Sequence, residues 1–287
     1  MRVIKTITQL RKELDKARAQ GQKIGFVPTM GYFHEGHLSL MRRAKKECDI
    51  CVVSIYVNPK QFGPKEDLRT YPRDIKRDRA MIRKENVDIL FIPSDNVVYP
   101  NRYLTYIDVE KISNTLCGKY RPGHFKGVAT VVAKLLNMVA PDVMYLGQKD
   151  AQQVAVLSKM VADLDFPVNI RVVLTAREKD GLAMSSRNIF LTPQERAQAP
   201  VLYRALKYAV GRIQAGERSA PKIISTIRKI ITQQSSGRIQ YVACVDAGTL
   251  EPVGVLKHRV LIALAVFFNR TRLIDNVIVP IKSARKI

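Results

Sequence analysis

The chain has 287 residues, of which 46% are apolar, and its 48 Lys and Arg residues outnumber its 25 Asp and Glu residues to give a net charge of +23. This apolar content excludes intrinsic disorder, and the longest apolar run, residues 260–268, is far shorter than the roughly 20 residues that cross a bilayer. The first residues contain no apolar leader, so we expect a cytoplasmic protein of one large or two ordinary domains.

The positive charge is concentrated toward the C-terminus. Residues 196–287 contain 16 basic and 4 acidic side chains. Such an excess is compatible with nucleic acid, an anionic membrane, a polyanionic small substrate or a merely soluble surface, and charge alone does not choose among them. Cys48 and Cys51 have the spacing of a metal pair, but a second pair is not spaced to complete a zinc site, so we predict no metal and interpret Cys51 as a buried apolar residue.

Short apolar strands alternate with helical patterns over the first 175 residues. The strands are predicted at 24–28, 50–57, 88–92, 143–147 and 170–174, with helices at 38–48, 128–139 and 152–164. This alternation is typical of βαβ units, so we predict an α/β domain with a Rossmann-like parallel sheet over residues 1–177. Such a sheet binds ligands beyond the carboxyl ends of its strands.

A smaller domain is predicted for residues 178–287, after a polar stretch at 177–188. A capping box from Thr192 to Glu195, with Pro193 at the first helical position, opens a helix toward Ile213. A second helix is expected at 221–232, followed by β-rich runs at 239–245, 259–267 and 273–279. These elements predict an α+β domain with helices and a small antiparallel sheet.

The first chemical motif lies where a predicted strand turns into a helix, at residues 27–37, Val-Pro-Thr-Met-Gly-Tyr-Phe-His-Glu-Gly-His. His34 and His37 lie three residues apart across the helix start, and Gly36 has no side chain to block a ligand from the backbone. Backbone N–H groups and the helix dipole favour an anion there, and two imidazoles can donate hydrogen bonds to phosphate. A metal pair, which needs a different spacing and a third ligand, and two solvated histidines are the alternatives.

The second motif is Leu-Ala-Met-Ser-Ser-Arg-Asn at 182–188, on the linker after the last strand of the sheet. The hydroxyls of Ser185 and Ser186 and the guanidinium of Arg187 are suited to hold a triphosphate. Together the two motifs resemble the HIGH and KMSKS signatures of the nucleotidyltransferase superfamily, whose members use ATP to activate carboxylates or transfer nucleotidyl groups. No P-loop or Gly-x-Gly-x-x-Gly motif is present, so the ATP prediction depends on this pair.

Two further segments follow predicted strands. The long, aperiodic stretch 57–74 offers the amides of Asn58 and Gln61 to a small polar ligand, with Phe62 as an apolar wall, although a plain surface loop is equally compatible. Segment 146–153 contains Gly147, Lys149 within reach of phosphate, and Asp150 and Gln153, which we expect on one helix face. His124, in a basic loop at 121–127, is a further candidate for the pocket.

With these motifs in this order, PTMG and HEGH, NPxQFG, RPGHFxGV, GxKDxQQ and GLAMSSRN, the chain closely resembles the pantoate–β-alanine ligase family over nearly its whole length. The resemblance implies amide formation in two steps. Pantoate attacks the α-phosphorus of MgATP to give pantoyl adenylate and pyrophosphate, and the amine of β-alanine then displaces AMP to give pantothenate. It also implies a homodimer and a C-terminal lid domain.

The resemblance assigns residues by matching position. His37 would be the proton donor, with His34 beside it on the phosphates; Gln61 and Gln153 would hold pantoate, and Gln61 would also contact β-alanine. The ATP-binding residues would be Met30, Gly31, Tyr32, Phe33, His34, Glu35, Gly36, His37, Gly147, Gln148, Lys149, Asp150, Ala176, Met184, Ser185, Ser186 and Arg187.

The chain departs from the family pattern at five positions without losing a proposed polar catalytic group. Tyr32 and Phe33 replace Ala and Leu, Gln148 replaces Glu, Ala176 replaces Val and Asn269 replaces Gly. Two other functions share the motifs: an RNA-binding relative of aminoacyl-tRNA synthetases, and a nucleotidyltransferase that acts on a phosphate ester. Because few residues and no aromatic cluster follow the Ser-Ser-Arg loop, we predict small-molecule partners and neither nucleic acid nor membrane.

Overall fold

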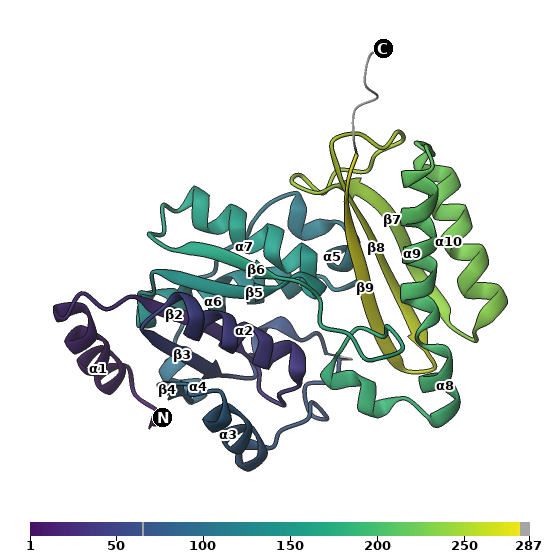
Figure 1. Cartoon of the computed structure of the whole chain (residues 1–287). Coiled ribbons are helices and arrows are strands. Elements are labelled where there is room, and N and C mark those ends of the chain that lie inside the picture. Colours follow the sequence, from purple (N-terminus) through teal and green to yellow (C-terminus); the bar gives the residue numbers. More distant parts are fainter. Residues whose placement is uncertain (65, 282–287) are drawn as a thin grey trace. The chain divides into compact units, whose positions relative to one another are not determined.

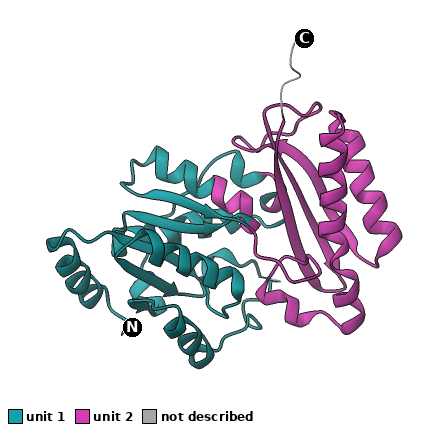
Figure 2. Ribbon diagram, viewed as in Figure 1, with its two compact units in different colours: residues 1–114, 118–148, 156–174 teal, residues 115–117, 149–155, 175–287 magenta. Residues whose placement is uncertain are grey.

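The computed structural model describes residues 1–64 and 66–281, and this part of the chain divides into two compact units (Figure 2). Unit 1 comprises residues 1–114, 118–148 and 156–174, and unit 2 comprises residues 115–117, 149–155 and the chain from Thr175 onward. Each unit is an independent layer structure with its own sheet.

Unit 1 contains a parallel sheet, and its six described strands run in the order β1-β4-β3-β2-β5-β6 (Figure 1). The bounds are β1 Arg2–Ile4, β2 Ile24–Thr29, β3 Ile50–Ile55, β4 Ile89–Phe91, β5 Val143–Gly147 and β6 Asn169–Val173. The Rossmann-like parallel sheet and all five predicted strands are confirmed, with ends that move by one or two residues. The additional strand β1 has only three residues, too few to show a period of two.

The order of the strands reverses beside β2. From β2 the chain adds β3 and then β4 on one side, whereas β5 and β6 lie on the other side, with Gly25 and Phe26 of β2 paired to Val143 and Met144 of β5. Such a reversal is the topological switch point at which open α/β sheets bind ligands, outside the carboxyl ends of the strands. Residues that follow Thr29 and Gly147 are therefore in position to contact a ligand.

Helices connect these strands. They are α1 Ile7–Ala19, α2 Glu35–Glu47, α3 Ile75–Lys84, α4 Asp95–Val98, α5 Leu116–Tyr120, α6 His124–Val139 and α7 Ala151–Asp163. Alternate residues of the strands, including Val27, Val53 and Tyr145, form one buried cluster with α2 and with Ile82 of α3. Cys51 belongs to this cluster, as expected of a buried apolar residue. The period of two along each strand thus places one row of side chains against the helices.

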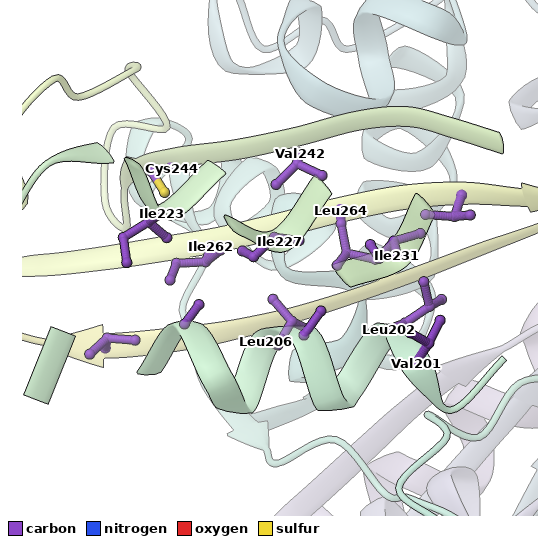
Figure 3. Packing of buried hydrophobic residues seen from close by; sticks show 14 of the residues in the cluster. Val201, Leu202, Leu206, Ile223, Ile227, Ile231, Val242, Cys244, Ile262 and Leu264 are labelled. Carbon is purple, nitrogen blue, oxygen red and sulfur yellow. The ribbon is translucent and has the colours of Figure 1, made fainter. Parts of the chain in front are cut away.

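Unit 2 contains an antiparallel sheet of β7 Arg238–Asp246, β8 Arg259–Phe268 and β9 Thr271–Pro280, covered by α9 Val201–Gln214 and α10 Ala220–Gln234. Figure 3 shows its core, in which Ile223, Ile227 and Ile231, one turn apart on α10, meet Leu206 of α9 and Leu264 of β8. The predicted α+β region with a small antiparallel sheet is confirmed. Unit 2 therefore buries its own core without help from the parallel sheet.

The helix predicted from Thr192 to Ile213 is wrong in one respect, because it is two helices. The capping box forms as predicted: Glu195 N–H donates to Thr192 Oγ1 over 3.3 Å and Thr192 N–H donates to Glu195 Oε2 over 2.8 Å. This box opens α8, Pro193–Gln198, and α9 then begins at Val201. Pro200 between them has no N–H to continue the hydrogen-bond ladder, which accounts for the break.

Candidate active site

A tight turn joins β2 to α2 at the switch point. Gly31 has φ +81° and Tyr32 has φ +51°, so two successive residues adopt the left-handed conformation that reverses the chain. A side chain at position 31 would be strained by this backbone and would meet Asp78 Oδ2 and Ile55 Cγ2, each 3.0 Å from its Cβ, so glycine is needed there. The Thr29 hydroxyl fixes the entry to the turn by accepting a hydrogen bond from Gly31 N–H over 3.1 Å.

His34 and His37 form a reciprocal cap at the start of α2. Gly36 N–H donates to Nδ1 of His34 over 3.1 Å, and His34 N–H donates to Nδ1 of His37 over 3.4 Å. A ring nitrogen that accepts a hydrogen bond carries no proton, so each neutral ring has its proton on Nε2. The ring centroids are 4.2 Å apart, so the two imidazoles lie side by side at the positive end of a helix.

Phe33 and Tyr32, the bulky departures from the family pattern, are both accommodated within unit 1. Phe33 is fully buried, and its ring contacts the ring of His37 edge-on at a centroid distance of 5.5 Å. The Tyr32 ring lies under the guanidinium of Arg77, whose central carbon is 4.9 Å from the ring centroid. Phe33 therefore packs into the core and Tyr32 is held by α3.

Two residues of α3 that the motifs do not include contact this turn. The carboxylate of Asp78 accepts hydrogen bonds from Tyr32 N–H at 2.6 Å and from Phe33 N–H at 2.8 Å, and Arg77 donates to the carbonyl of Phe33 over 2.9 Å. Burial raises the pKa of Asp78, an effect that the two backbone N–H groups and Arg77 oppose. The sequence alone does not single out Asp78, because its burial, shared within α3 only with Ile82, is known only from the structure.

A cavity of about 360 Å³ lies at the carboxyl ends of β2, β3 and β4, and Met30, Gly31 and Tyr32 contribute to its lining. This volume falls in the range of small-molecule sites. Three residues predicted to bind ATP thus border a cavity large enough for a small ligand.

Asn58 and Gln61, predicted to bind a small polar ligand, are buried side by side. Asn58 Nδ2 donates to Gln61 Oε1 over 3.1 Å and to the carbonyl of Gly127 over 3.0 Å, while the Tyr99 hydroxyl donates to Asn58 Oδ1 over 2.9 Å. The expectation of an aperiodic loop is therefore wrong at this point: residues 59–61 form the 3-10 helix η1, Pro59–Gln61, because Asn58 caps it through Lys60 N–H.

The backbone of Gln61 is held from α6. His124 Nδ1 and the carbonyl of Gln61 are 2.8 Å apart, and His124 Nε2 is 2.9 Å from Arg121, which also forms an ion pair of 2.6 Å with Glu66. A Cβ on Gly127 would lie 2.3 Å from the carbonyl oxygen of Lys60, so only glycine lets η1 approach α6 this closely. His124 thus contacts the backbone of Gln61, one of the predicted site residues.

The segment after β5 is divided between the units. Gly147 and Gln148 belong to unit 1, whereas Lys149, Asp150 and Gln153 belong to unit 2. Asp150 and Gln153 do not share a helix, contrary to expectation, because residues 148–150 form the 3-10 helix η3, Gln148–Asp150, and α7 begins only at Ala151. Within unit 2, Lys149 Nζ is 3.8 Å from Asp150 Oδ1, and the carbonyl of Lys149 accepts from Asn276 over 2.8 Å.

The Ser-Ser-Arg segment of unit 2 is a hydrogen-bonded turn. Ser185 caps the 3-10 helix η4, Ser186–Phe190, by accepting from Arg187 N–H over 3.2 Å, and Met184 N–H donates to the carbonyl of Ala176 over 3.0 Å. Ala176, Met184, Ser185 and Arg187 are half-buried and Ser186 is buried. The turn brings Ala176 next to Met184, two residues that the family resemblance assigns to the nucleotide.

A buried ion pair anchors the same turn within unit 2. Arg177 donates to both carboxylate oxygens of Asp275 at 2.7 and 2.9 Å and lies 3.6 Å above the centroid of the Tyr203 ring. Burial raises the pKa of Asp275, and the guanidinium of Arg177 acts against this rise. This pair joins residues 98 positions apart in the chain, a contact that sequence patterns do not reveal.

Over residues 1–64 and 66–281, His, Cys, Asp and Glu side chains form no group of three or more that is arranged to hold a metal ion. Within the same ranges, every helix is too short or too polar to span a bilayer.

A parallel sheet whose switch point presents two histidines at a helix start defines an α/β enzyme that acts on an anionic, phosphate-containing compound. A family model described as pantoate-beta-alanine ligase matches residues 2–278. The chain belongs to this family and is a ligase that joins pantoate to β-alanine.

Individual relatives match this chain over nearly its full length. The chain is 51% identical to the pantothenate synthetase of Thermoanaerobacter sp. (strain X514) over 278 residues, 97% of this chain and 98% of the relative. A crystal structure of pantothenate synthetase from Thermus thermophilus matches with a TM-score of 0.92 at 43% identity, over 96% of this chain and 99% of that one. Neither the RNA-binding function nor the phosphate-ester nucleotidyltransferase is favoured by these matches.

A third relative was crystallised with ligands. The pantoate-beta-alanine ligase of Francisella tularensis, described as complexed with beta-gamma ATP and beta-alanine, matches with a TM-score of 0.78 at 36% identity, over 96% of this chain and 97% of that one.

Proposed function

We propose that the chain joins pantoate to β-alanine through pantoyl adenylate. One carboxylate oxygen of pantoate attacks the α-phosphorus of ATP and pyrophosphate leaves. The amine of β-alanine then attacks the acyl carbon, the bond from that carbon to the AMP oxygen breaks, and the amine loses a proton to give the amide. The Francisella relative, crystallised with an ATP compound and β-alanine, supports this use of substrates.

The observation that carries the proposal is the histidine cap at the switch point. A neutral ring whose Nδ1 accepts a backbone hydrogen bond holds its proton on Nε2, so His34 and His37 are set to donate to phosphate oxygens. Negative charge grows on the phosphates as pyrophosphate leaves, and donors fixed in advance lower the barrier because they need no reorganisation. We assign His37 as the proton donor, with His34 beside it.

Pantoate is assigned to the amides of Gln61, Asn58 and Gln153, and β-alanine to Gln61. The support is the buried pair Asn58–Gln61, in which Gln61 Nε2 also lies 3.2 Å from Met30 Sδ, so that the segment expected to bind the acid adjoins the segment expected to bind ATP. Fixed hydrogen-bond donors and acceptors of this kind are what a site needs to recognise the carboxylate and hydroxyls of pantoate.

The nucleotide is assigned to residues from three segments. These are the turn from Met30 to His37, including Glu35 and Gly36, the stretch Gly147, Gln148, Lys149 and Asp150, and the turn with Ala176, Met184, Ser185, Ser186 and Arg187. The last two sets supply Lys149 and Arg187, the cations suited to a polyphosphate.

Other expectations remain predictions. We propose that ATP is used as its Mg²⁺ complex, that residues 1–177 bind ATP and pantoate while 178–287 act as a lid, that the protein is a homodimer, and that it works in the cytoplasm without nucleic acid or membrane.

An isotope experiment tests the adenylate directly. Pantoate labelled with ¹⁸O in its carboxylate is incubated with the protein, ATP and β-alanine. The products are separated, and the mass of each is measured by mass spectrometry. Attack on the α-phosphorus transfers one ¹⁸O into AMP. Unlabelled AMP, or ADP in its place, would refute the adenylate route, and a stable dinucleotide-like product would support the phosphate-ester alternative.

A further inference from the structure

The geometry points to Asp78 and Arg77, the first turn of α3, as positioning residues for the adenylation step. We propose that they hold the backbone of the turn that carries His34 and His37, and thereby set where the two imidazoles meet the phosphates. The inference rests on the proposed function, because it takes the histidines as the groups that act on ATP.

Asp78 contacts the turn through the backbone alone. Its two carboxylate oxygens accept from the N–H groups of two successive residues, Tyr32 at 2.6 Å and Phe33 at 2.8 Å, and its side chain is only 1% exposed. A bidentate carboxylate fixes the orientation of two adjacent peptide groups at once. His34 is the next residue in the chain, so this orientation is passed directly to the cap of α2.

The turn needs such a restraint because its backbone is strained. A non-glycine residue with positive φ, as at Tyr32, is strained and persists only where its surroundings hold it. The Asp78 carboxylate accepts from the N–H of that very residue. Without it, the buried Phe33 N–H and the half-buried Tyr32 N–H lose their acceptor, and relaxation of φ would rotate the chain just before His34.

Arg77 supplies a second hold on the same two residues. Its guanidinium covers the Tyr32 ring, donates to the Phe33 carbonyl over 2.9 Å and lies 3.6 Å from Asp78 Oδ1. Both the N–H and the carbonyl of Phe33 are therefore tied to α3. Neither side chain has to touch substrate to fulfil this role.

The experiment compares two aspartates that each accept hydrogen bonds from two backbone N–H groups. Asp78→Asn keeps the shape of the side chain but places an NH₂ group against a backbone N–H. Asp246→Asn is the matched control: Asp246 accepts from Gly248 N–H and Thr249 N–H through Oδ1 alone, asparagine keeps that oxygen, and the charge change is the same. The readout is pantoate-dependent ATP/pyrophosphate exchange, measured with thermal melting of each variant.

We expect Asp78→Asn to lower kcat of exchange by roughly 10²-fold, the scale of an angstrom-sized misplacement of catalytic groups, while KM for ATP changes by less than about threefold. Asp246→Asn should stay within about twofold of the parent. In a protein that already carries His37→Ala, adding Asp78→Asn should lower kcat by less than about threefold further. A residue that acts by positioning His37 can have little effect once His37 is absent. An equal loss of kcat with and without His37→Ala, or a loss no larger than that of Asp246→Asn, would overturn the proposal.

Arg77→Met provides a second test if Asp78→Asn proves unstable, because Arg77 is 42% exposed and its loss spares the core. We expect a fall in kcat of about tenfold, the effect of one hydrogen bond to a charged group. Full activity of this variant would contradict the inference. Absence of exchange in the unmodified protein would instead contradict the proposed function, so the two failures are distinguishable.

Discussion

The side-chain amide of Gln61 lies 3.2 Å from the sulfur of Met30, which joins the segment after β3 to the turn after β2. Both residues belong to unit 1 and follow neighbouring strands of the parallel sheet. The acid-binding and ATP-binding segments predicted from separate motifs therefore meet at one edge of the sheet.

Asn58→Ala is expected to raise KM for pantoate by roughly tenfold, because the Gln61 amide loses the hydrogen bond that orients it. Tyr99→Phe, which removes only the hydroxyl that donates to Asn58, should raise it by a few-fold. Steady-state kinetics with pantoate varied measure both changes. An unchanged KM in Asn58→Ala would exclude this amide pair from pantoate binding.

Gly127→Ala is expected to lower the unfolding temperature markedly, since the new Cβ would lie 2.3 Å from the carbonyl oxygen of Lys60 and push η1 away from α6. Gly211→Ala is the control: it is also a helical glycine, but its Cβ meets nothing within 4 Å, so the variant should gain up to about 1 kcal/mol. Thermal melts of both variants test this contrast. Equal shifts of the unfolding temperature in the two variants would refute it.

Arg177→Gln is expected to destabilise unit 2 by about 3–5 kcal/mol, because Asp275 would remain buried without its guanidinium partner. Arg196→Gln breaks the exposed Arg196–Asp180 pair and should cost less than about 1 kcal/mol. Chemical denaturation followed by circular dichroism compares the two. Similar midpoints would show that the Arg177 pair contributes little.

The ion pair between Glu66 and Arg121 should make the stability of the fold depend on pH. Burial acts to raise its pKa, but the hydrogen bonds and charge of Arg121 outweigh this and hold the pKa below the ordinary value. A carboxyl with a lowered folded pKa stabilises the fold above its ordinary pKa of about 4.3, and this contribution is lost as the pH falls. Glu66→Gln should thus be less stable than the parent by about 1 kcal/mol at pH 7, and this difference should shrink as the pH falls below about 4. A gap that persists in acid would contradict the assignment.

His37→Ala is expected to slow adenylation by roughly 10²-fold, the usual loss when one preorganised donor is removed. Synthetic pantoyl adenylate supplied to the variant should still react with β-alanine at close to the parental rate. Rapid-quench measurement of each half-reaction separates the two. Normal adenylation by the variant would remove His37 from the proposed role.

The strands and the histidine turn were predictable because each is a local pattern. Residues 143–147 are a short apolar run that ends at glycine, and His34 and His37 stand in a strand-turn-helix sequence. The supports of the site were not predictable in the same way. Asp78 is recognisable only once α3 is known to bury that face, and the partnership of Arg177 with Asp275 depends on the packing of β9.

The most direct measurement is pantoate-dependent exchange of labelled pyrophosphate into ATP, with β-alanine omitted. Because adenylation is reversible and precedes the entry of the amine, the account predicts exchange when pantoate is present and none when it is left out. Exchange that ignores pantoate, or that requires β-alanine, would contradict the formation of pantoyl adenylate as the first step.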